Sequence, residues 1–205
     1  MGIYSSGKRI FDFTIAFIVL LILWPVFLCI AIFIKLDSKG PVFFKQRRIG
    51  KDKQEFSIIK FRTMKIETPK EVPTHLLENP DVYITRVGKL LRKTSLDELP
   101  QVFNILKGDM SMVGPRPALW NQFDLITERD KYGCNQLYPG LTGWAQVNGR
   151  DELSIEEKAN FDGEYVNNIS LLFDINILFL TVIRVVRRRG VKEGKLYEII
   201  NYRKE

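Results

Sequence analysis

In this 205-residue chain, the residue types and spacing that most clearly suggest chemistry are those of two adjacent carboxylates, Asp97 and Glu98. Ser95 precedes them, and a serine followed three residues later by a glutamate is also the ordinary capping box of a helix. With Ser95 as the cap, Pro100 falls where the Leu96 carbonyl needs an N–H donor; a helix starting near Asp97 avoids this. Either arrangement favours ionised carboxylates, so Asp97 could attack phosphorus and Glu98 could hold Mg²⁺.

Several cations could serve the same chemistry. Arg116 lies between two prolines in Gly114-Pro115-Arg116-Pro117. The prolines fix the backbone and remove its donors, which holds a guanidinium ready for bidentate contact with a phosphate. A rigid turn with a solvated arginine explains this segment equally well. Lys60 and Arg62 end an expected strand, and Arg92 comes shortly before the acidic pair.

A third cluster, residues 139–150, contains three glycines together with Gln146 and Arg150. Glycines let a loop approach a ligand closely, and the amide and guanidinium could then contact it. Trp144 could stack on a base or a sugar, although such a tryptophan is more often part of a core. The chain has no phosphate-loop motif, no dinucleotide glycine motif and no zinc-protease motif, so its function must come from these clusters.

Charge and apolar residues are unevenly distributed. Eight basic and three acidic residues lie between Arg184 and Glu205, which gives this segment +5 of the net charge of +7. A basic excess suits nucleic acid, phosphate substrates or an acidic membrane surface, and the apolar run near the N-terminus makes the membrane surface the first choice. Cys29 and Cys134 are not expected to pair, and His75 is interpreted as a loop residue without metal partners.

The apolar run of residues 10–34 is too long for a signal peptide and has no cleavage site after it. About 20 apolar residues suffice to span a membrane, so a spanning helix is one interpretation. A re-entrant helix is the other, because Pro25 breaks the hydrogen-bond ladder and basic residues flank both ends of the run. The residues alone leave both topologies open.

Periodicity predicts the remaining elements. Residues 42–44 and 56–61 favour a β-hairpin, and residues 67–81 a surface loop. Residues 86–92, 97–106, 118–132 and 154–166 are expected helices, the last with a Ser154–Glu157 capping box. Residues 171–186 form a helix that lies either on the membrane or in the core, and three arginines follow it.

Five segments together resemble the bacterial sugar transferase family, the small monotopic phosphoglycosyl transferases. They are Lys8-Arg9-Ile10-Phe11-Asp12, Lys60-Phe61-Arg62-Thr63-Met64, Ser95-Leu96-Asp97-Glu98-Leu99-Pro100-Gln101, Gly114-Pro115-Arg116-Pro117 and residues 139–150. The likeness covers nearly the whole chain in the family's order and spacing, which makes coincidence negligible.

The resemblance implies a mostly helical α+β fold. Residues 1–36 would form a re-entrant membrane helix bent at Trp24-Pro25, where the family commonly has Ser-Pro. The proline break survives, but the serine hydroxyl that could satisfy a freed carbonyl is missing. Residues 37–205 would form a cytoplasmic globular catalytic domain with interfacial amphipathic helices, the C-terminal one at about 170–189. The implied location is the cytoplasmic face of the bacterial inner membrane.

The resemblance also implies a reaction. A UDP-sugar and undecaprenyl (polyprenol) phosphate would give a polyprenol-diphosphate sugar and UMP, with Mg²⁺ as cofactor. The family's aspartate nucleophile, which carries the phosphosugar covalently, falls on Asp97, and its metal-binding glutamate falls on Glu98. Substrate contacts would fall on Lys60, Arg62, Arg92, Arg116, Gln146 and Arg150. The compact form favours an N-acetylhexosamine over a hexose.

Two alternatives remain from the sequence. In the first, the lipid phosphate attacks directly and Asp97 acts only as a base. In the second, the chain is a membrane-tethered binding protein that recruits acidic lipid or nucleic acid through its basic tail. That function explains the charge and the apolar run but neither the Asp-Glu pair nor the proline-flanked Arg116, so no nucleic-acid partner is expected.

Overall fold

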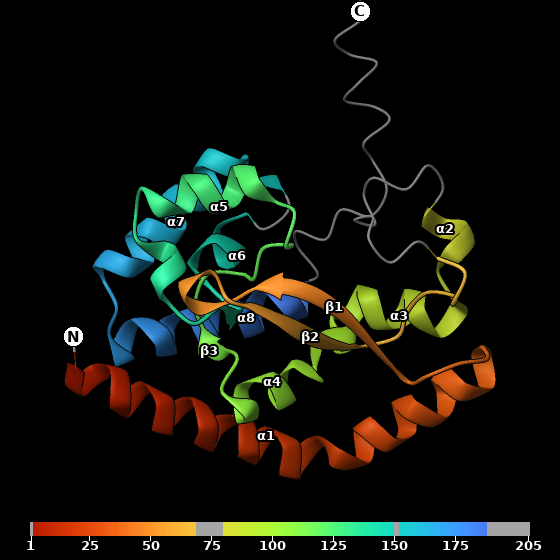
Figure 1. The fold of residues 1–205 in the computed structure, drawn as a ribbon. Helices are drawn as coiled ribbons and strands as arrows, with labels where there is room; N and C mark the ends of the chain where they lie inside the picture. Colours follow the sequence, from red (N-terminus) through yellow and green to blue (C-terminus); the bar gives the residue numbers. More distant parts are fainter. Residues whose placement is uncertain (1, 69–79, 150–151, 188–205) are drawn as a thin grey trace, which may run out of the picture.

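The structure is a computed structural model that describes residues 2–68, 80–149 and 152–187. It is a mostly helical α+β arrangement, as the sequence predicts (Figure 1). Arg150, His75, most of the loop expected at residues 67–81 and the basic tail beyond residue 187 lie outside the described residues. The helices are α1 (Gly2–Asp37), α2 (Pro80–Tyr83), α3 (Arg86–Thr94), α4 (Gln101–Lys107), α5 (Phe123–Asp130), α6 (Trp144–Asn148), α7 (Ile155–Asn167) and α8 (Leu171–Arg187). The strands are β1 (Phe43–Ile49), β2 (Glu55–Phe61), β3 (Ser111–Val113) and β4 (Gly140–Thr142), and the 3-10 turns are η1 (Lys51–Lys53), η3 (Leu96–Glu98) and η4 (Cys134–Gln136).

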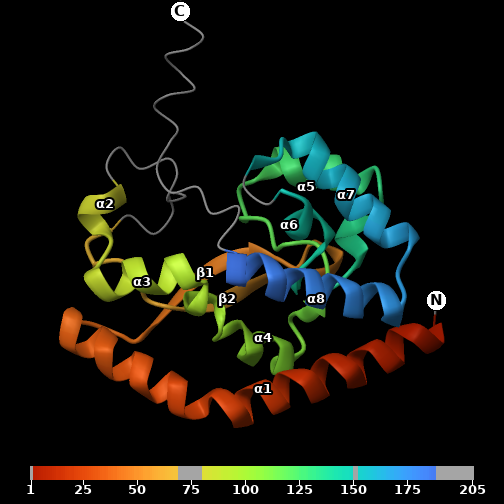
Figure 2. The ribbon, with the colours of Figure 1, turned by 180° about the vertical axis from the view of Figure 1, so that it is seen from behind.

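Helix α1 is continuous, and it contains Pro25. Figures 1 and 2, which are opposite views, show it bent near its middle, with the convex side away from the other elements and both arms rising toward them. A proline inside a helix removes one hydrogen bond and crowds the preceding turn, which accounts for a bend. Among the described residues, 7–37 form the one helix that is long and apolar enough to cross a membrane, and the most apolar 18-residue stretch within it has a mean hydropathy of 3.1.

Buried polar contacts fix the first arm of α1 to the rest of the molecule. Asp12 is buried and accepts a hydrogen bond of 2.7 Å from the hydroxyl of Ser111 in β3. Lys8 donates to buried Asp174 of α8 at 2.6 Å. Because buried charges are stable only when they are paired, these contacts fix where α1 sits against β3 and α8. The Lys8–Asp12 segment of the sequence resemblance is therefore a docking element.

The predicted hairpin is confirmed. Strands β1 and β2 are antiparallel, with Phe44 opposite Lys60, and β1 extends further than predicted, to Ile49. One face of the hairpin packs on α1 and α4 through aromatic rings, with Phe27 and Phe61 centroids 5.3 Å apart. Since side chains alternate along a strand, Phe44 and Lys60 share the opposite face, which is where the hairpin can contribute to a site.

The glycines of residues 139–150 do not form an open loop. A Cβ on Gly140 would lie 2.2 Å from the backbone nitrogen of Gly114, and one on Gly143 would lie 2.1 Å from the Gly114 carbonyl oxygen. Strand β4 pairs in parallel with β3 just before Gly114. The glycines therefore let two backbones touch, and this contact fixes the segment that leads into Arg116.

Most expected helices are present, with different bounds. Helix α3 covers the predicted 86–92, α7 carries the predicted Ser154–Glu157 capping box, and α8 covers 171–186. The helix expected at 118–132 is shorter, because α5 begins at Phe123. The helix expected at 97–106 is wrong in its start: Pro100 precedes α4, and Asp97 and Glu98 lie in η3. Cys29 and Cys134 are unpaired, as predicted.

Candidate active site

The turn η3 presents Asp97 and Glu98 between α3 and α4. Ser95 ends α3 in the left-handed conformation, with φ 56°, and its side chain caps no helix. The capping-box interpretation of Ser95 and Glu98 is therefore wrong. A non-glycine residue in this region is strained, and such strain persists only where the surroundings hold the backbone in place. The strained serine lets the chain turn so that Glu98 meets β2.

Glu98 lies between two cations. Its Oε1 accepts 2.8 Å from Nζ of Lys60 and 2.7 Å from Arg116, whose second guanidinium nitrogen donates to Oε2 at 3.3 Å. The side chains are 12% (Glu98), 16% (Lys60) and 32% (Arg116) exposed. Charge-assisted and forked contacts of this kind are strong when they are shielded from water. The structure thus brings β2, η3 and the Gly114–Pro117 segment together at one carboxylate.

Asp97 differs from its neighbour. Among the described residues, no side chain or backbone group donates a hydrogen bond to its carboxylate. Burial raises the pKa of Asp97, Lys60 opposes this most strongly, Glu98 raises the pKa further, and Arg92 and Arg116 lower it. A carboxylate that is poorly solvated and unbonded, yet close to several cations, suits a nucleophile toward a phosphate ester.

The same surroundings act on the cations. Burial lowers the pKa of Lys60, and Glu98 opposes that shift. Burial, followed by the charge of Arg116, lowers the pKa of Arg48 to about 10. Arg48 is a residue that sequence reasoning missed, although it shares the hairpin face of Phe44. It donates to the Pro117 carbonyl oxygen at 3.0 Å and so helps to hold the segment that carries Arg116.

Arg129 is a second missed residue, and it holds Arg116 from α5. Its guanidinium donates twice to Oδ2 of Asp162, at 2.8 and 2.6 Å, and once to the carbonyl oxygen of Arg116, at 2.8 Å. Burial raises the pKa of Asp162, and Arg129 opposes this. Both side chains are almost fully buried. No local sequence signal marks this pair, because its members come from different helices and meet only in the fold.

Replacing Arg129 by Gln is expected to raise the KM for the phosphate substrate about tenfold or more, because the backbone of Arg116 is no longer held. Removing one member of a buried ion pair also lowers the free energy of unfolding by about 3–5 kcal/mol. Steady-state kinetics and thermal unfolding measure the two effects. The control is the double variant Arg129→Met with Asp162→Leu, which should recover stability but not KM. A double variant with a normal KM would contradict the positioning role.

The other predicted site residues fall into two groups. Arg92 is in the last turn of α3 and acts on the Asp97 charge, so it belongs to the cluster. Arg62 does not contact the Asp97–Glu98 cluster, because its guanidinium donates to the carbonyl oxygens of Ser38 and Lys39, which follow α1. Gln146 donates to the Leu141 carbonyl oxygen at 3.3 Å, and no contact joins it to Asp97 or Glu98 among the described residues. Trp144 packs on Phe173, with ring centroids 5.0 Å apart.

The donor set permits one kind of metal site. Within the described ranges, no three His, Cys, Asp or Glu side chains are grouped so that the protein alone could hold a metal ion. Mg²⁺ is usually bound by one or two carboxylates together with substrate phosphates, and Glu98 supplies one such carboxylate. The residues present therefore fit a magnesium ion that arrives with a phosphorylated substrate.

Comparison with known proteins connects this cluster to a family. A family model described as bacterial sugar transferase matches residues 3–188. The uncharacterized sugar transferase EpsL of Bacillus subtilis (strain 168) is 42% identical over 186 residues, which are 91% of this chain and 90% of that protein.

Relatives with a stated substrate are longer. The UDP-glucose:undecaprenyl-phosphate glucose-1-phosphate transferase of Escherichia coli (strain K12) is 44% identical over 191 residues, which are 89% of this chain and 41% of the relative. The UDP-N-acetylgalactosamine-undecaprenyl-phosphate N-acetylgalactosaminephosphotransferase of Aeromonas hydrophila is 39% identical, over 93% of this chain and 46% of the relative. The chain thus spans less than half the length of these two relatives.

Proposed function

Because the chain belongs to the bacterial sugar transferase family, we propose that it transfers a sugar 1-phosphate from a UDP-sugar to undecaprenyl phosphate and releases UMP. The observation that carries this proposal is the Asp97 carboxylate, which accepts no hydrogen bond from the residues that the structure describes and lies beside the Glu98–Lys60–Arg116 cluster. Such a site can bind a diphosphate and stabilise the charge that develops when its bridging bond breaks. The relatives' names divide between glucose and N-acetylgalactosamine, and an N-acetylhexosamine donor stays our expectation.

In the proposed mechanism Asp97 is the nucleophile. Its carboxylate oxygen forms a bond to the β-phosphorus, and the bond from that phosphorus to the bridging oxygen breaks, so UMP leaves with the electron pair. The undecaprenyl phosphate oxygen then attacks the same phosphorus and releases Asp97 as a carboxylate. Arg116, Arg92 and Lys60 face the developing negative charge. Mg²⁺, held by Glu98 with the substrate phosphates, would neutralise part of that charge when bound.

The nucleotide that is released distinguishes the proposed reaction from glycosyl transfer and from simple binding. Purified protein with a UDP-sugar, Mg²⁺ and undecaprenyl phosphate should release UMP, whereas a glycosyltransferase would release UDP and a binding protein would release neither nucleotide. Donors to compare are UDP-glucose and UDP-N-acetylgalactosamine, which the relatives' names suggest. Release of UDP, or of no nucleotide from any donor tested, would contradict the proposal.

The rate should depend on pH through Asp97. Only the ionised carboxylate can attack, so activity is lost as pH falls through the pKa of Asp97, which burial raises above the ordinary value of about 3.9. Lys60 opposes that rise most strongly, so Lys60→Met should move the acid limb of the kcat/KM profile to higher pH. Lys131→Met, at an exposed ion pair, is the control. An acid limb that does not move would contradict the proposed coupling.

The membrane arrangement is part of the same proposal. We propose that α1 enters the membrane, bends at Pro25 and returns, which keeps the remaining residues at the cytoplasmic face of the bacterial inner membrane. Its two arms rise on the same side in Figures 1 and 2, and basic residues flank both ends. Helix α8 adds an exposed apolar face, with Leu172 81% and Phe179 63% exposed. Such a face suits a helix at head-group level, where a lipid phosphate lies.

Both ends of α1 are therefore expected to be accessible from the cytoplasm. Single cysteines at Ser5 and Lys39, in a chain with Cys29→Ser, should both react with a membrane-impermeant thiol reagent only after the cells are opened. Cys134 is buried, and burial raises its pKa to about 12, so it should not react. Labelling of Ser5→Cys in intact spheroplasts, with Lys39→Cys protected, would contradict the re-entrant arrangement.

A further inference from the structure

The last residue of α1, Asp37, is joined to the first turn of α3. Its Oδ2 accepts a hydrogen bond of 2.9 Å from the backbone N–H of Val87, which lies 50 residues along the chain. Thr85, the N-cap of α3, accepts from the N–H of Gly88 at 2.9 Å. The first N–H groups of a helix have no partner within it, and each of these two oxygens satisfies one of them. The start of α3 is therefore held both by its own cap and by the end of α1.

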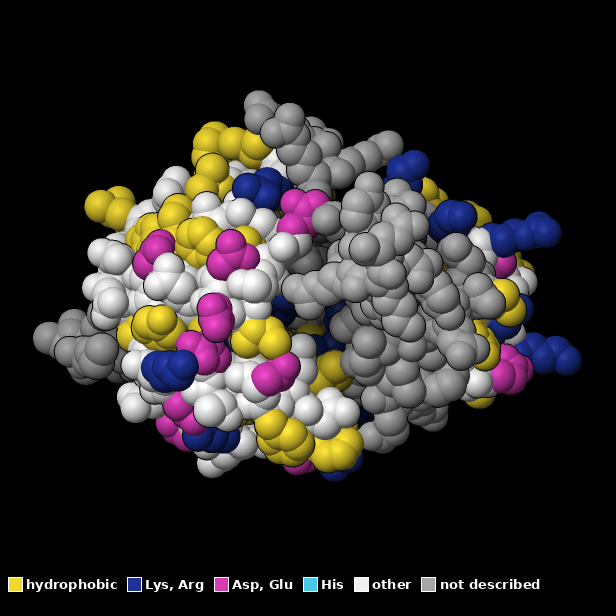
Figure 3. All heavy atoms as spheres, turned by 90° about the horizontal axis from the view of Figure 1, so that it is seen from above, with side chains coloured by type: hydrophobic (Ala, Val, Ile, Leu, Met, Phe, Trp, Pro, Cys, Tyr) yellow, Lys and Arg dark blue, Asp and Glu magenta, His cyan; other side chains and the backbone are white. Residues whose placement is uncertain are grey.

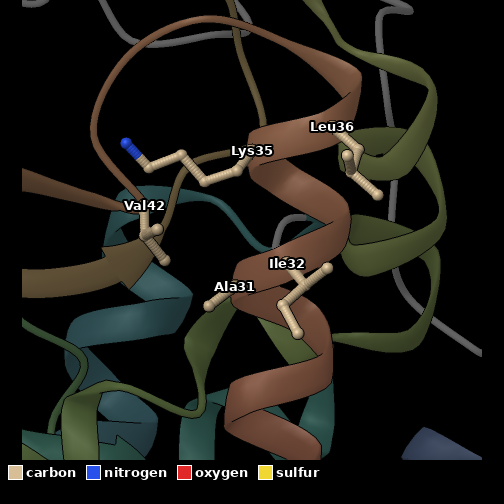
Figure 4. A pocket seen from close by; sticks show the side chains of 5 residues that line it. All are labelled: Ala31, Ile32, Lys35, Leu36 and Val42. Atoms are coloured by element: carbon tan, nitrogen blue, oxygen red, sulfur yellow. The ribbon is translucent and has the colours of Figure 1, made fainter.

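The turn that follows Asp37 is held by Arg62, the predicted site residue that lies outside the cluster. Its side chain is buried and donates to the carbonyl oxygens of Ser38 and Lys39. The backbone N–H of Arg62 also donates to the Val42 carbonyl oxygen at 2.9 Å. Figure 4 shows this end of α1 from close by, with the chain returning through the turn to Val42. Arg62 therefore fixes the end of α1, and with it Asp37, to the end of β2.

The segment after β2 also holds the inner face of α3. A Cβ on Gly88 would lie 2.0 Å from the carbonyl oxygen of Thr63, so the two backbones touch. The N–H of Thr85 donates to the same oxygen at 3.0 Å. The end of α1, the end of β2 and the start of α3 thus form one hydrogen-bonded junction.

The outer face of α3 is exposed and basic. Its exposed side chains include Arg86, Lys89 and Lys93, and its buried residues are Gly88 and Leu91. In Figure 3, which views the side away from α1, lysine and arginine side chains protrude at the right edge, and in Figure 1 this edge holds α3 and the end of α1. Exposed charged side chains contribute little to holding a helix in place. The position of α3 therefore depends on its start and on its inner face.

The other end of α3 leads directly into the active site. Arg92 lies in its last turn, and Ser95 ends it and begins η3, which carries Asp97. A helix of nine residues moves as one unit, so a shift at its start also displaces Arg92 and Asp97. The hydrogen bond from Val87 to Asp37 therefore acts at one end of α3, and Asp97 lies just beyond the other.

The opposite side of the cluster is held independently of α3. Asp12, in the first arm of α1, accepts from the N–H of Met112 in β3 at 3.1 Å, shortly before the segment that carries Arg116. Arg129 donates to the Arg116 carbonyl oxygen, and Lys60 belongs to β2. Loosening the start of α3 should therefore shift Asp97 relative to these cations and leave the cations in place.

We propose that Asp37 is a positioning residue: by holding the start of α3, it places Asp97 and Arg92 against the bound diphosphate. The inference rests on the proposed function and adds how the nucleophile is held. Because Asp37 also ends α1, the helix that we propose to enter the membrane, the same contact sets the position of Asp97 relative to the membrane surface. Helix α1 is then part of the catalytic scaffold as well as an anchor.

The test compares two changes that each remove one hydrogen bond from the first turn of α3. Asp37→Ala detaches α3 from α1, whereas Thr85→Ala, the matched control, removes the cap and leaves α3 joined to α1. Both changes should lower the melting temperature. Only Asp37→Ala should lower kcat for UMP formation, by about tenfold or more, because a small misplacement of a reacting group slows the reaction strongly.

Two further measurements separate positioning from general damage. Asp37→Asn keeps an acceptor oxygen for the N–H of Val87 and should recover most of the lost kcat. The Kd of UDP for Asp37→Ala, measured by calorimetry with Mg²⁺, should stay within about twofold of wild type, because the cations that bind the diphosphate keep their places.

Every other result overturns the inference. A normal kcat in Asp37→Ala would leave Asp37 with a role in helix stability alone. An equal loss of kcat in Thr85→Ala would mean that any weakening of α3 is sufficient. An Asp37→Asn protein as slow as Asp37→Ala, or weaker binding of UDP to Asp37→Ala, would show that the hydrogen bond to α3 is not the cause. Failure of the proposed function is distinguishable, because the wild-type protein itself would then release no UMP.

Discussion

Replacing Asp97 by Asn is expected to lower the rate of UMP formation by at least about a thousandfold, because the amide is not a nucleophile toward phosphorus. The same change should not lower stability. Burial raises the pKa of Asp97, so the ionised side chain at neutral pH is less favourable in the folded state than in the unfolded one. A neutral Asn removes that penalty. A melting temperature equal to or above that of the wild type, together with lost activity, is the predicted result.

The control for Asp97→Asn is Asp130→Asn. Hydrogen bonds from Lys53 and Asn135 lower the pKa of this exposed aspartate. Its ionised form therefore stabilises the folded state, whereas that of Asp97 destabilises it. Asp130 also lies outside the catalytic cluster. Its loss should leave the rate unchanged. An Asp97→Asn protein that loses both activity and stability would indicate a structural carboxylate and contradict the assigned role.

Replacing Glu98 by Gln is expected to lower kcat about a thousandfold and, unlike the change at Asp97, to lower stability. Lys60 and Arg116 both donate to this carboxylate, so the variant leaves two largely buried cations without their counter-charge. Removing one member of a buried ion pair typically lowers the free energy of unfolding by about 3–5 kcal/mol, and the partial exposure of Arg116 places this variant at the lower end. Magnesium titration of the rate should show a weakened dependence.

Glu55→Gln is the matched control for Glu98→Gln. Glu55 pairs with Arg47, but both side chains are half exposed, so this pair should contribute little to stability and nothing to the rate. The opposite stability effects at Asp97 and Glu98 are the informative comparison. If Glu98→Gln kept its rate within about tenfold of wild type, Glu98 would serve only to separate two positive charges, and the result would contradict its catalytic role.

Local signals in the sequence predicted the elements that depend on local physics. The hairpin, α3, the Ser154–Glu157 capping box of α7 and the apolar helix α8 follow from periodicity and capping within a few residues of chain. Lys60, Arg92 and Arg116, which are three of the six substrate contacts that the family resemblance implies, lie around Asp97 and Glu98, and their role in binding substrate stays a prediction.

Contacts between distant segments account for what the sequence did not predict. The Ser95–Glu98 pattern indicates a cap, but the left-handed Ser95 ends one helix instead of starting the next. From the sequence, Gly140 and Gly143 are expected in a ligand-binding loop. In the structure they instead allow their backbone to lie against the backbone of Gly114. Arg129 meets the Arg116 carbonyl only through tertiary packing. Arg62, predicted in the site because of its neighbours in the chain, instead binds carbonyls that follow α1.

Intact-mass measurement of the protein after incubation with UDP-sugar and Mg²⁺, without undecaprenyl phosphate, shows whether Asp97 carries the phosphosugar. We expect a wild-type species heavier by one sugar phosphate, formed with a stoichiometric release of UMP and lost again when undecaprenyl phosphate is added. The Asp97→Asn protein should show no such species. A wild-type protein that turns over with acceptor but never carries the added mass, or an adduct that persists in Asp97→Asn, would contradict Asp97 as the nucleophile.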